Sequence, residues 1–480
     1  MKNHPKKLPA QADSVAGSNP AGWRAALSVT ALLIAAAFAL SPTSARALPS
    51  FARQLNMQCT ACHTSFPMLN QFGRTFKLTG YTESADDASW LPIAYMLMPS
   101  FTHTSTPQAG GAAPGFSEND NTALTQASVF YAGRLFGPYA KSWFGPDGAA
   151  LANKFGVFAQ VTYDGIGKSW AWDNMELRFA DKAEAGGHDV VYGAYLNNNP
   201  SLQDPWNSTP AFGFPFSGSG LAPTPAAATL IEGGLSQQVA GLGAYAMVDD
   251  RYYFDVGGYR TLSAHFQKAM GVDPSGEAQV SGLAPYWRLA YERPVGEGRW
   301  EIGTFGMMAS TYPGRDASEG SDRITDFGLD SQYQLATKRG EVALMATWIH
   351  EQQRWSASEA LESTANKSDS LDSFKLTASY LHDKTYGLTV QYFSVTGSAD
   401  ALLYADSATG SPNSDGFIFQ ADYLPLNKGT GPGIWPRSNV KFSLQYVSYN
   451  RFNGGRDNFD GAGAKASDNN TLYLEAWIAF

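Results

Sequence analysis

The sequence has little cysteine, little charge and no long apolar segment in its main part. Only two cysteines occur among 480 residues, which excludes a scaffold held together by disulfides. Charged residues make up 16% of the chain, against about a quarter in typical soluble domains. This low charge excludes a coiled coil and a charged disordered chain. After residue 47 no apolar run reaches the ~18 residues of a transmembrane helix.

Positive charge is also scarce, and most of the surplus acid lies beyond the first 47 residues. The whole chain has 34 basic and 43 acidic residues, a net charge of −9. Without residues 1–47, which hold five basic residues and one acid, the net charge is −13. An acidic surface repels nucleic acid and attracts cations, so no nucleic-acid partner is expected.

The N-terminus has the three parts of a secretory signal peptide. Basic residues precede an apolar run at 25–40, and Ala45-Arg46-Ala47 follows it. This order predicts export and cleavage after Ala47, with 1–47 as the signal peptide. An uncleaved membrane anchor is the alternative.

Both cysteines belong to one short motif, Cys59-Thr60-Ala61-Cys62-His63. C-x-x-C-H is the attachment sequence for c-type haem. The two thiols bond the haem vinyl groups, and the histidine becomes the proximal iron ligand. A redox C-x-x-C would not require the histidine, and a zinc site needs four ligands. The motif therefore predicts one covalent haem c on Cys59, Cys62 and His63.

The second axial ligand of the iron stays open, because several suitable side chains lie nearby. The candidates are Met57, Met68, Met96, Met98 and His103. A single methionine is more often a packing residue than a ligand.

The rest of the chain alternates apolar and polar residues with a period of two. The pattern is clear at 155–164, 374–380 and 440–446, and it predicts strands with one apolar and one polar face. Such strands build either a soluble β-sandwich or a transmembrane barrel, which faces lipid with its apolar side.

Three features favour the barrel. Short and long connections alternate from the C-terminus backward, as in outer-membrane barrels. The last strand alternates up to a terminal aromatic, Phe480. Sixteen segments can be counted, an even number that puts both ends on one side of the membrane. They are 91–104, 124–136, 154–164, 170–180, 188–198, 229–248, 251–262, 282–293, 299–311, 322–335, 341–354, 371–382, 386–396, 415–425, 438–450 and 471–480.

The predicted fold is therefore an all-β, about 16-stranded antiparallel transmembrane barrel with a small, mostly helical haem segment. Residues 48–90 form the haem segment and 91–480 the barrel, in contact with outer-membrane lipid. The 229–248 segment is long enough for two strands, and the Gly/Pro-rich connection at 200–228 is expected outside the barrel.

Residues 48–82 resemble the haem segment of outer-membrane fused cytochrome–porins. The similarity rests on Phe51-Ala52-Arg53-Gln54, the Cys59–His63 motif, Phe66-Pro67, Leu69, Phe72-Gly73-Arg74, Phe76-Lys77 and Gly80-Tyr81. In the best-known members of that family one haem takes electrons from extracellular Fe(II) and passes them to periplasmic cytochromes. The resemblance implies a bacterial outer-membrane Fe(II):cytochrome c oxidoreductase.

The residues after the motif suggest how the haem segment is held. Phe66, Leu69, Phe72 and Phe76 are spaced to cover a haem face. Arg74 and Lys77 either pair with haem propionates or are solvated surface charges. A segment of about 40 residues is too small to fold alone, so it is expected to dock inside the lumen as a plug.

Three functions remain in competition. The first is electron transfer from Fe(II) through the haem to a periplasmic c-type cytochrome or another soluble carrier. The second is the same path with a different extracellular donor. The third is a diffusion porin whose haem is structural or sensory. Acidic residues in the external loops would attract a cation such as Fe(II).

Overall fold

The computed structural model describes residues 48–64, 67–85, 92–208, 217–275, 278–428 and 438–480. The predicted signal peptide lies outside the described residues. Within them, sixteen strands form a barrel wall. One further strand of only two residues, β8 (Gln279–Val280), pairs with β10. The wall consists of β1 (Ile93–Thr104), β2 (Asn121–Arg134), β3 (Phe155–Asp164), β4 (Ser169–Ala185), β5 (His188–Asn197), β6 (Val239–Val248), β7 (Tyr252–Thr261), β9 (Ala284–Val295), β10 (Gly298–Tyr312), β11 (Asp322–Thr337), β12 (Gly340–Arg354), β13 (Ser368–His382), β14 (Tyr386–Gly397), β15 (Ser414–Tyr423), β16 (Asn439–Arg451) and β17 (Thr471–Ala479).

The barrel closes because its last strand pairs with its first. β17 runs antiparallel to β1, with Met96 opposite Ala479 and Thr104 opposite Thr471. The other wall strands pair antiparallel in chain order, with β7 next to β9. Closure leaves no free sheet edge, so the backbone groups are satisfied even in lipid. The predicted 16-stranded antiparallel barrel is confirmed.

The long segment predicted at 229–248 holds only one strand. Residues Leu230–Gly234 form a helical turn, and β6 begins at Val239. The Thr229 side chain accepts a hydrogen bond from the Glu232 backbone amide, and the Glu232 carboxylate accepts one from the Thr229 backbone amide. A capping pair of this kind favours a helical turn over an extended strand.

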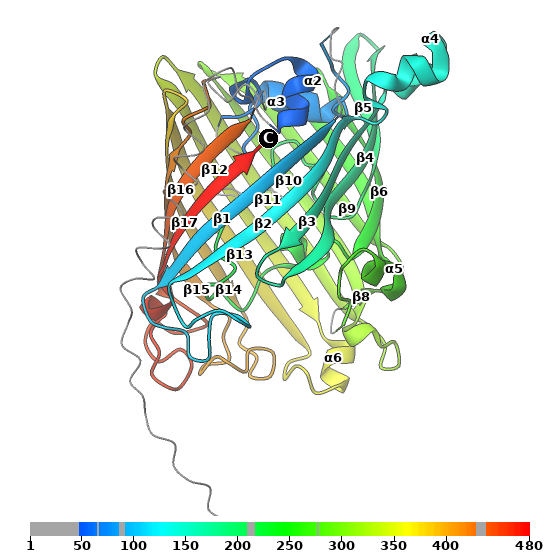
Figure 1. Cartoon of the computed structure of the whole chain (residues 1–480). Helices are drawn as coiled ribbons and strands as arrows, with labels where there is room; N and C mark the ends of the chain where they lie inside the picture. Colours follow the sequence, from blue (N-terminus) through cyan, green and yellow to red (C-terminus); the bar gives the residue numbers. More distant parts are fainter. Residues whose placement is uncertain (1–47, 65–66, 86–91, 209–216, 276–277, 429–437) are drawn as a thin grey trace, which may run out of the picture. The chain divides into compact units, whose positions relative to one another are not determined.

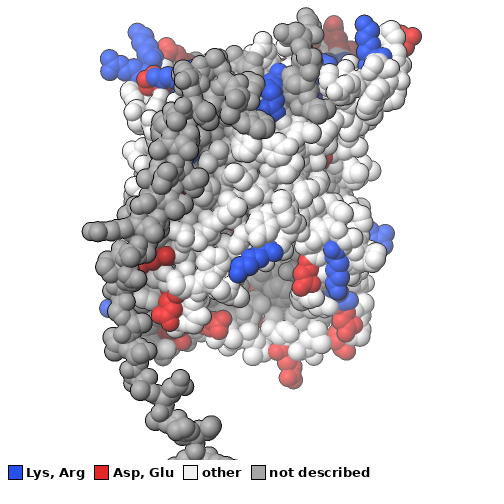
Figure 2. Space-filling view, in the orientation of Figure 1, with Lys and Arg blue, Asp and Glu red and all other residues white. Residues whose placement is uncertain are grey.

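The two faces of the wall are inverted relative to a soluble protein. Leu242 and Val256 are 67% and 62% exposed on the outside, whereas the side chains of Arg178 and Arg288 are fully buried inside. Figure 2 shows one face on which charged side chains gather at the two ends of the barrel, with a largely uncharged band between them. Apolar residues outside and polar residues inside exclude the β-sandwich and identify a transmembrane barrel.

The two ends of the barrel differ in their connections. The C-terminus and helices α2 (Pro49–Leu55), α3 (Gln71–Leu78) and α4 (Ala140–Ala152) lie at one end (Figure 1). Helices α5 (Ala264–Ala269) and α6 (Ser356–Ala360) lie in loops at the other end. The connections beside the C-terminus are mostly short, which marks that end as periplasmic. Among the described helices, none is long and apolar enough to cross a bilayer.

Candidate functional site

The C-x-x-C-H motif lies in a short helical turn between α2 and α3. Asn56 ends α2 in a left-handed conformation, and Cys59–Ala61 then forms a 3₁₀ turn. The amide groups of Cys62 and His63 both donate to the Cys59 carbonyl, at 3.1 and 3.0 Å. Cys59 and Cys62 are buried and form no disulfide with each other. The sulfur atoms and the histidine are thus held together within one turn, as covalent haem attachment requires.

The side chain of His63 has the hydrogen bond and the protonation state that a metal ligand needs. Its Nδ1 lies 3.2 Å from the Pro67 carbonyl oxygen. Because a carbonyl only accepts, Nδ1 carries the proton and Nε2 carries the lone pair. Desolvation lowers the pKa of the His63 imidazole to about 4, so the ring is neutral at pH 7. A neutral imidazole whose other nitrogen donates to a backbone carbonyl is the usual form of a ligating histidine. These residues fit a covalently bound haem.

Asn70 and Gly73 connect the motif to α3. Asn70 donates from its side chain to the Ala61 carbonyl at 3.0 Å and from its amide to the Cys62 carbonyl at 2.9 Å. Its side-chain oxygen accepts from the Gly73 amide and caps the helix. A β-carbon on Gly73 would lie 2.2 Å from the Cys62 carbonyl oxygen. The sequence pointed to Gly73 through the family resemblance and as a residue that permits a turn, whereas the role of Asn70 was not predicted. The signal for Asn70 was its position directly before the apolar helical pattern.

An aromatic cluster joins this segment to the barrel wall. Phe51 contacts Phe76 edge-on at 5.1 Å and stacks on Tyr81 at 5.0 Å between ring centroids. Phe158 of β3 lies against Phe51 and Tyr81. Leu55 and Cys62 belong to the same buried cluster. Phe76, which the sequence suggested as a haem cover, therefore serves at least partly to dock the segment; Phe66 lies outside the described residues.

Arg74 and Lys77 correct a prediction, because they neither extend into solvent nor are available to a propionate. Both are 4% exposed. Arg74 forms an ion pair with Glu292 of β9 at 2.8 Å and donates to Gln334 of β11 at 2.8 Å. Lys77 donates to the Asp204 carbonyl at 2.6 Å. Both side chains therefore anchor α3 to luminal groups.

The end of α3 is bound equally closely on its other side. The Arg178 guanidinium donates to the Lys77 carbonyl at 2.8 Å and pairs with Glu176 at 2.8 Å. The Tyr81 hydroxyl donates to Glu176 at 3.0 Å. Gly156 lets β3 approach closely, since a β-carbon there would lie 1.6 Å from the Gly80 carbonyl oxygen. The haem segment is thus packed against the inner wall at the periplasmic mouth.

Part of the connection between β5 and β6 also folds inward, although the sequence placed it outside. Leu202, Asp204 and Trp206 are at most 1% exposed. The Trp206 indole donates to Glu292 at 2.7 Å, which is the same carboxylate that binds Arg74. Charged groups inside the lumen therefore attract this connection into the barrel, and its Gly/Pro-rich composition does not encode those partners.

The candidates for the second axial ligand occupy different places. Met68 packs against Ala343 of β12, and Met57 is exposed. Met96 and Met98 lie on β1 in a buried cluster that also contacts Phe51. His103 is ten residues, or about 33 Å of strand, from Ile93, whose carbonyl accepts from Arg53 of the haem segment. It forms a hydrogen bond with Asp120 at 2.7 Å, and this far position excludes it as a ligand.

Comparison with known proteins finds distant structural similarity to outer-membrane proteins. No family model matches the sequence, and no curated protein sequence is significantly similar to it. Similar solved structures include OmpF of Salmonella typhi, at 13% identity and a TM-score of 0.45 over 81% of this chain and 97% of that one. The channel DcaP of Acinetobacter baumannii has 11% identity and a TM-score of 0.44 over 81% and 96%. OmpT of Vibrio cholerae has 10% identity and a TM-score of 0.40 over 81% and 97%.

The strand pairing and the inverted faces define the class directly. A closed antiparallel barrel with an apolar outer band is a structure of the bacterial outer membrane. The chain is a porin-like outer-membrane β-barrel with a short helical segment, carrying the C-x-x-C-H motif, bound inside its periplasmic mouth.

Proposed function

We propose that the protein moves electrons through one covalent haem in the mouth of an outer-membrane barrel. The main support is the hydrogen bond from His63 to the Pro67 carbonyl, in a motif locked to the wall by buried ion pairs. A diffusion porin has no need of a histidine oriented in this way. Haem c, when bound, supplies reversible one-electron transfer.

The chain's own residues hold and position this group. Cys59 and Cys62 would form its thioether bonds, and His63 would bind the iron through Nε2. Burial of Arg74 and Lys77 in the wall fixes α3, which supports the motif through Asn70. A rigid support keeps the iron environment constant between oxidised and reduced states, which favours fast electron transfer.

The position of the segment supports a proposal for each of the two electron partners. The periplasmic mouth gives a periplasmic c-type cytochrome or another soluble carrier direct access. The apolar band of such a barrel is about 25 Å tall, so a single haem does not reach the cell exterior. The donor, for which we propose Fe(II), enters the lumen from the extracellular side.

Reduction by Fe(II) in purified outer membranes tests this proposal. We expect the absorption bands of oxidised haem to shift to those of the reduced form when Fe(II) is added. Cys62→Ala should abolish covalent haem and the shift. His103→Ala is the matched control, a histidine at the far end of the barrel, and should change neither.

Conductance distinguishes the porin alternative, which the polar lumen favours. Full-length protein in planar bilayers should conduct weakly, because the haem segment and the inward connection around Trp206 occupy the lumen. Large conductance together with no reduction by Fe(II) would establish a porin. Reduction by another donor and not by Fe(II) would keep the electron path and change its substrate.

A further inference from the structure

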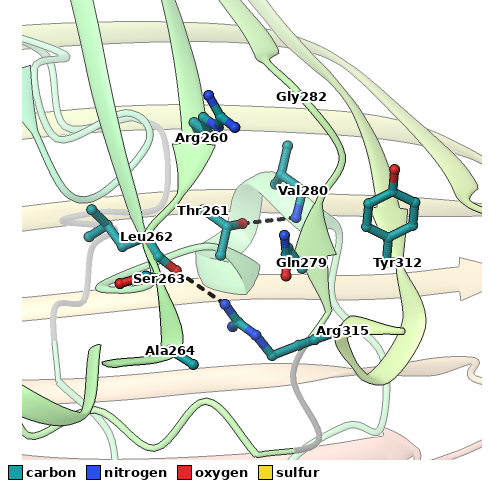
Figure 3. Close-up of a pocket in the computed structure, with 10 residues that line it drawn as sticks. All are labelled: Arg260, Thr261, Leu262, Ser263, Ala264, Gln279, Val280, Gly282, Tyr312 and Arg315. Atoms are coloured by element: carbon teal, nitrogen blue, oxygen red, sulfur yellow. Dashed lines mark hydrogen bonds between the residues drawn. The ribbon is translucent and has the colours of Figure 1, made fainter. Parts of the chain in front are cut away.

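A cavity of about 800 Å³ lies in the wall at the extracellular end, far from the haem motif. It is bordered by the end of β7, by β8 and by the beginning of the connection after β10 (Figure 3). At this end of the wall β8 pairs with β10, with Val280 opposite Thr311. Thr261 accepts a hydrogen bond from the Val280 amide at 2.8 Å and closes the floor of the opening.

The cavity faces the lipid side of the wall. Tyr259 of β7 is fully buried inside the barrel, so the next residue, Arg260, points outward. On β10 Thr311 is buried inside, and Tyr312 therefore points outward opposite Gln279. Arg260, Gln279 and Tyr312 thus lie on the membrane side of the cavity, whereas Thr261 and Val280 border it from the inner face of the wall.

The lining is cationic. Arg260 and Arg315 line it on either side of Gln279 (Figure 3), and none of the ten lining residues in the described part of the chain is an aspartate or glutamate. The Nη2 atom of Arg315 donates to the Leu262 carbonyl at 3.1 Å. Its Nη1 atom is buried and has no hydrogen-bond partner among the described residues. A buried guanidinium nitrogen without an acceptor needs an anionic or polar partner.

The depth of Arg260 fits the headgroup layer of the outer leaflet. Tyr252, at the periplasmic end of β7, is exposed and precedes Arg260 by eight residues. Eight residues span about 26 Å of strand, or roughly 20 Å along the membrane normal at a typical tilt. The intervening outward residues Phe254 and Val256 are apolar. Arg260 therefore stands at the extracellular edge of the apolar band, where a lipid-facing charge is tolerated.

We propose that this cavity binds a phosphate monoester, as carried by a phosphorylated headgroup of the outer leaflet. Guanidinium groups bind phosphate through paired charged hydrogen bonds. A volume near 800 Å³ accommodates a sugar phosphate as well as free phosphate. This binding would not involve the haem. A lipid bound here would fix the depth of the barrel in the membrane and the lipid beside it.

Native mass spectrometry of the full-length protein in detergent tests the site. Diphosphoryl lipid A and its dephosphorylated form are the two lipid probes. We expect the diphosphoryl form to bind at least tenfold more tightly, and Arg260→Gln/Arg315→Gln to remove that preference. Arg323→Gln is the matched control, because this arginine of β11 is exposed at the same end of the barrel but does not line the cavity.

Inorganic phosphate separates the two sources of the ligand. If only a large molar excess of phosphate displaces lipid A, the result supports the lipid headgroup as the ligand of the cavity. Phosphate binding as tight as lipid A binding would overturn the lipid assignment. Equal binding of both lipid forms, or equal loss in Arg323→Gln, would overturn the site. If the double variant does not fold, the single change Arg260→Gln replaces it, since this exposed side chain lies at the cavity edge.

Discussion

Replacing Arg74 by methionine should release the haem segment from the wall. The side chains of Arg74 and Glu292 are only 5% and 3% exposed in their ion pair. Removing one partner of such a buried pair costs about 3–5 kcal/mol, because the other charge stays buried. Glu292 keeps contacts with Arg299 and with the Trp206 indole. The cost should therefore be near the lower limit, about 3 kcal/mol, which increases the undocked population about 150-fold.

Hydrogen exchange of the α3 amides measures this release. Amides of Gln71–Leu78 should exchange about 100-fold faster in Arg74→Met when exchange proceeds through undocking. Amides in β13, far from the segment, provide the internal reference for intact barrel structure.

Lys182→Gln is the matched control, because Lys182 also forms an ion pair between the haem segment and the barrel wall. Lys182 and Glu83 lie 3.0 Å apart, but their side chains are 61% and 33% exposed. An exposed pair contributes about 0–1 kcal/mol, so the exchange rate should rise less than about fivefold. Equal effects of the two variants, or unchanged α3 exchange in Arg74→Met, would refute the anchoring role of burial.

Three further changes address the motif, the plug and the lumen. Gly73→Ala should weaken packing of α3 on the motif by about 1–3 kcal/mol, because its β-carbon meets the Cys62 carbonyl oxygen; slower α3 exchange than wild type would contradict this. Burial lowers the pKa of Lys77 to about 8, whereas an undocked lysine keeps its proton to about pH 10.4. Binding of the haem segment to the wall should therefore become stronger as the pH rises from 8 to 10. Protection of the α3 amides from hydrogen exchange should rise with pH in the wild type and should not rise in Lys77→Met. Trp206→Ala should increase single-channel conductance by opening the lumen, whereas Trp143→Ala, at an exposed site on α4, should not.

The strands could be predicted from sequence because alternation is a local property. β11 illustrates this: Phe327 and Leu329 point to lipid and Asp326 and Asp330 to the lumen, as their order in the chain indicates. The connection lengths were also informative, since short turns constrain neighbouring strands to pair. The even strand number placed both ends of the wall on one side of the membrane, and β1 and β17 do pair with each other.

The partners of charged residues could not be predicted, because they depend on contacts distant in sequence. Arg74 and Glu292 are 218 residues apart, and no local pattern links them. The inward path of residues 199–208 depends in the same way on Glu292 and Arg288 of β9. The C-x-x-C-H motif, by contrast, occupies five consecutive residues and could be recognised from the sequence alone. The hydrogen bond from His63 to the Pro67 carbonyl was not predicted.

The intact mass of the mature polypeptide, isolated from purified outer membranes, tests the central claim most directly. The account predicts the mass of the chain plus one haem, and the bare polypeptide mass for Cys62→Ala. A wild-type protein in the outer membrane with the mass of the bare polypeptide would contradict it.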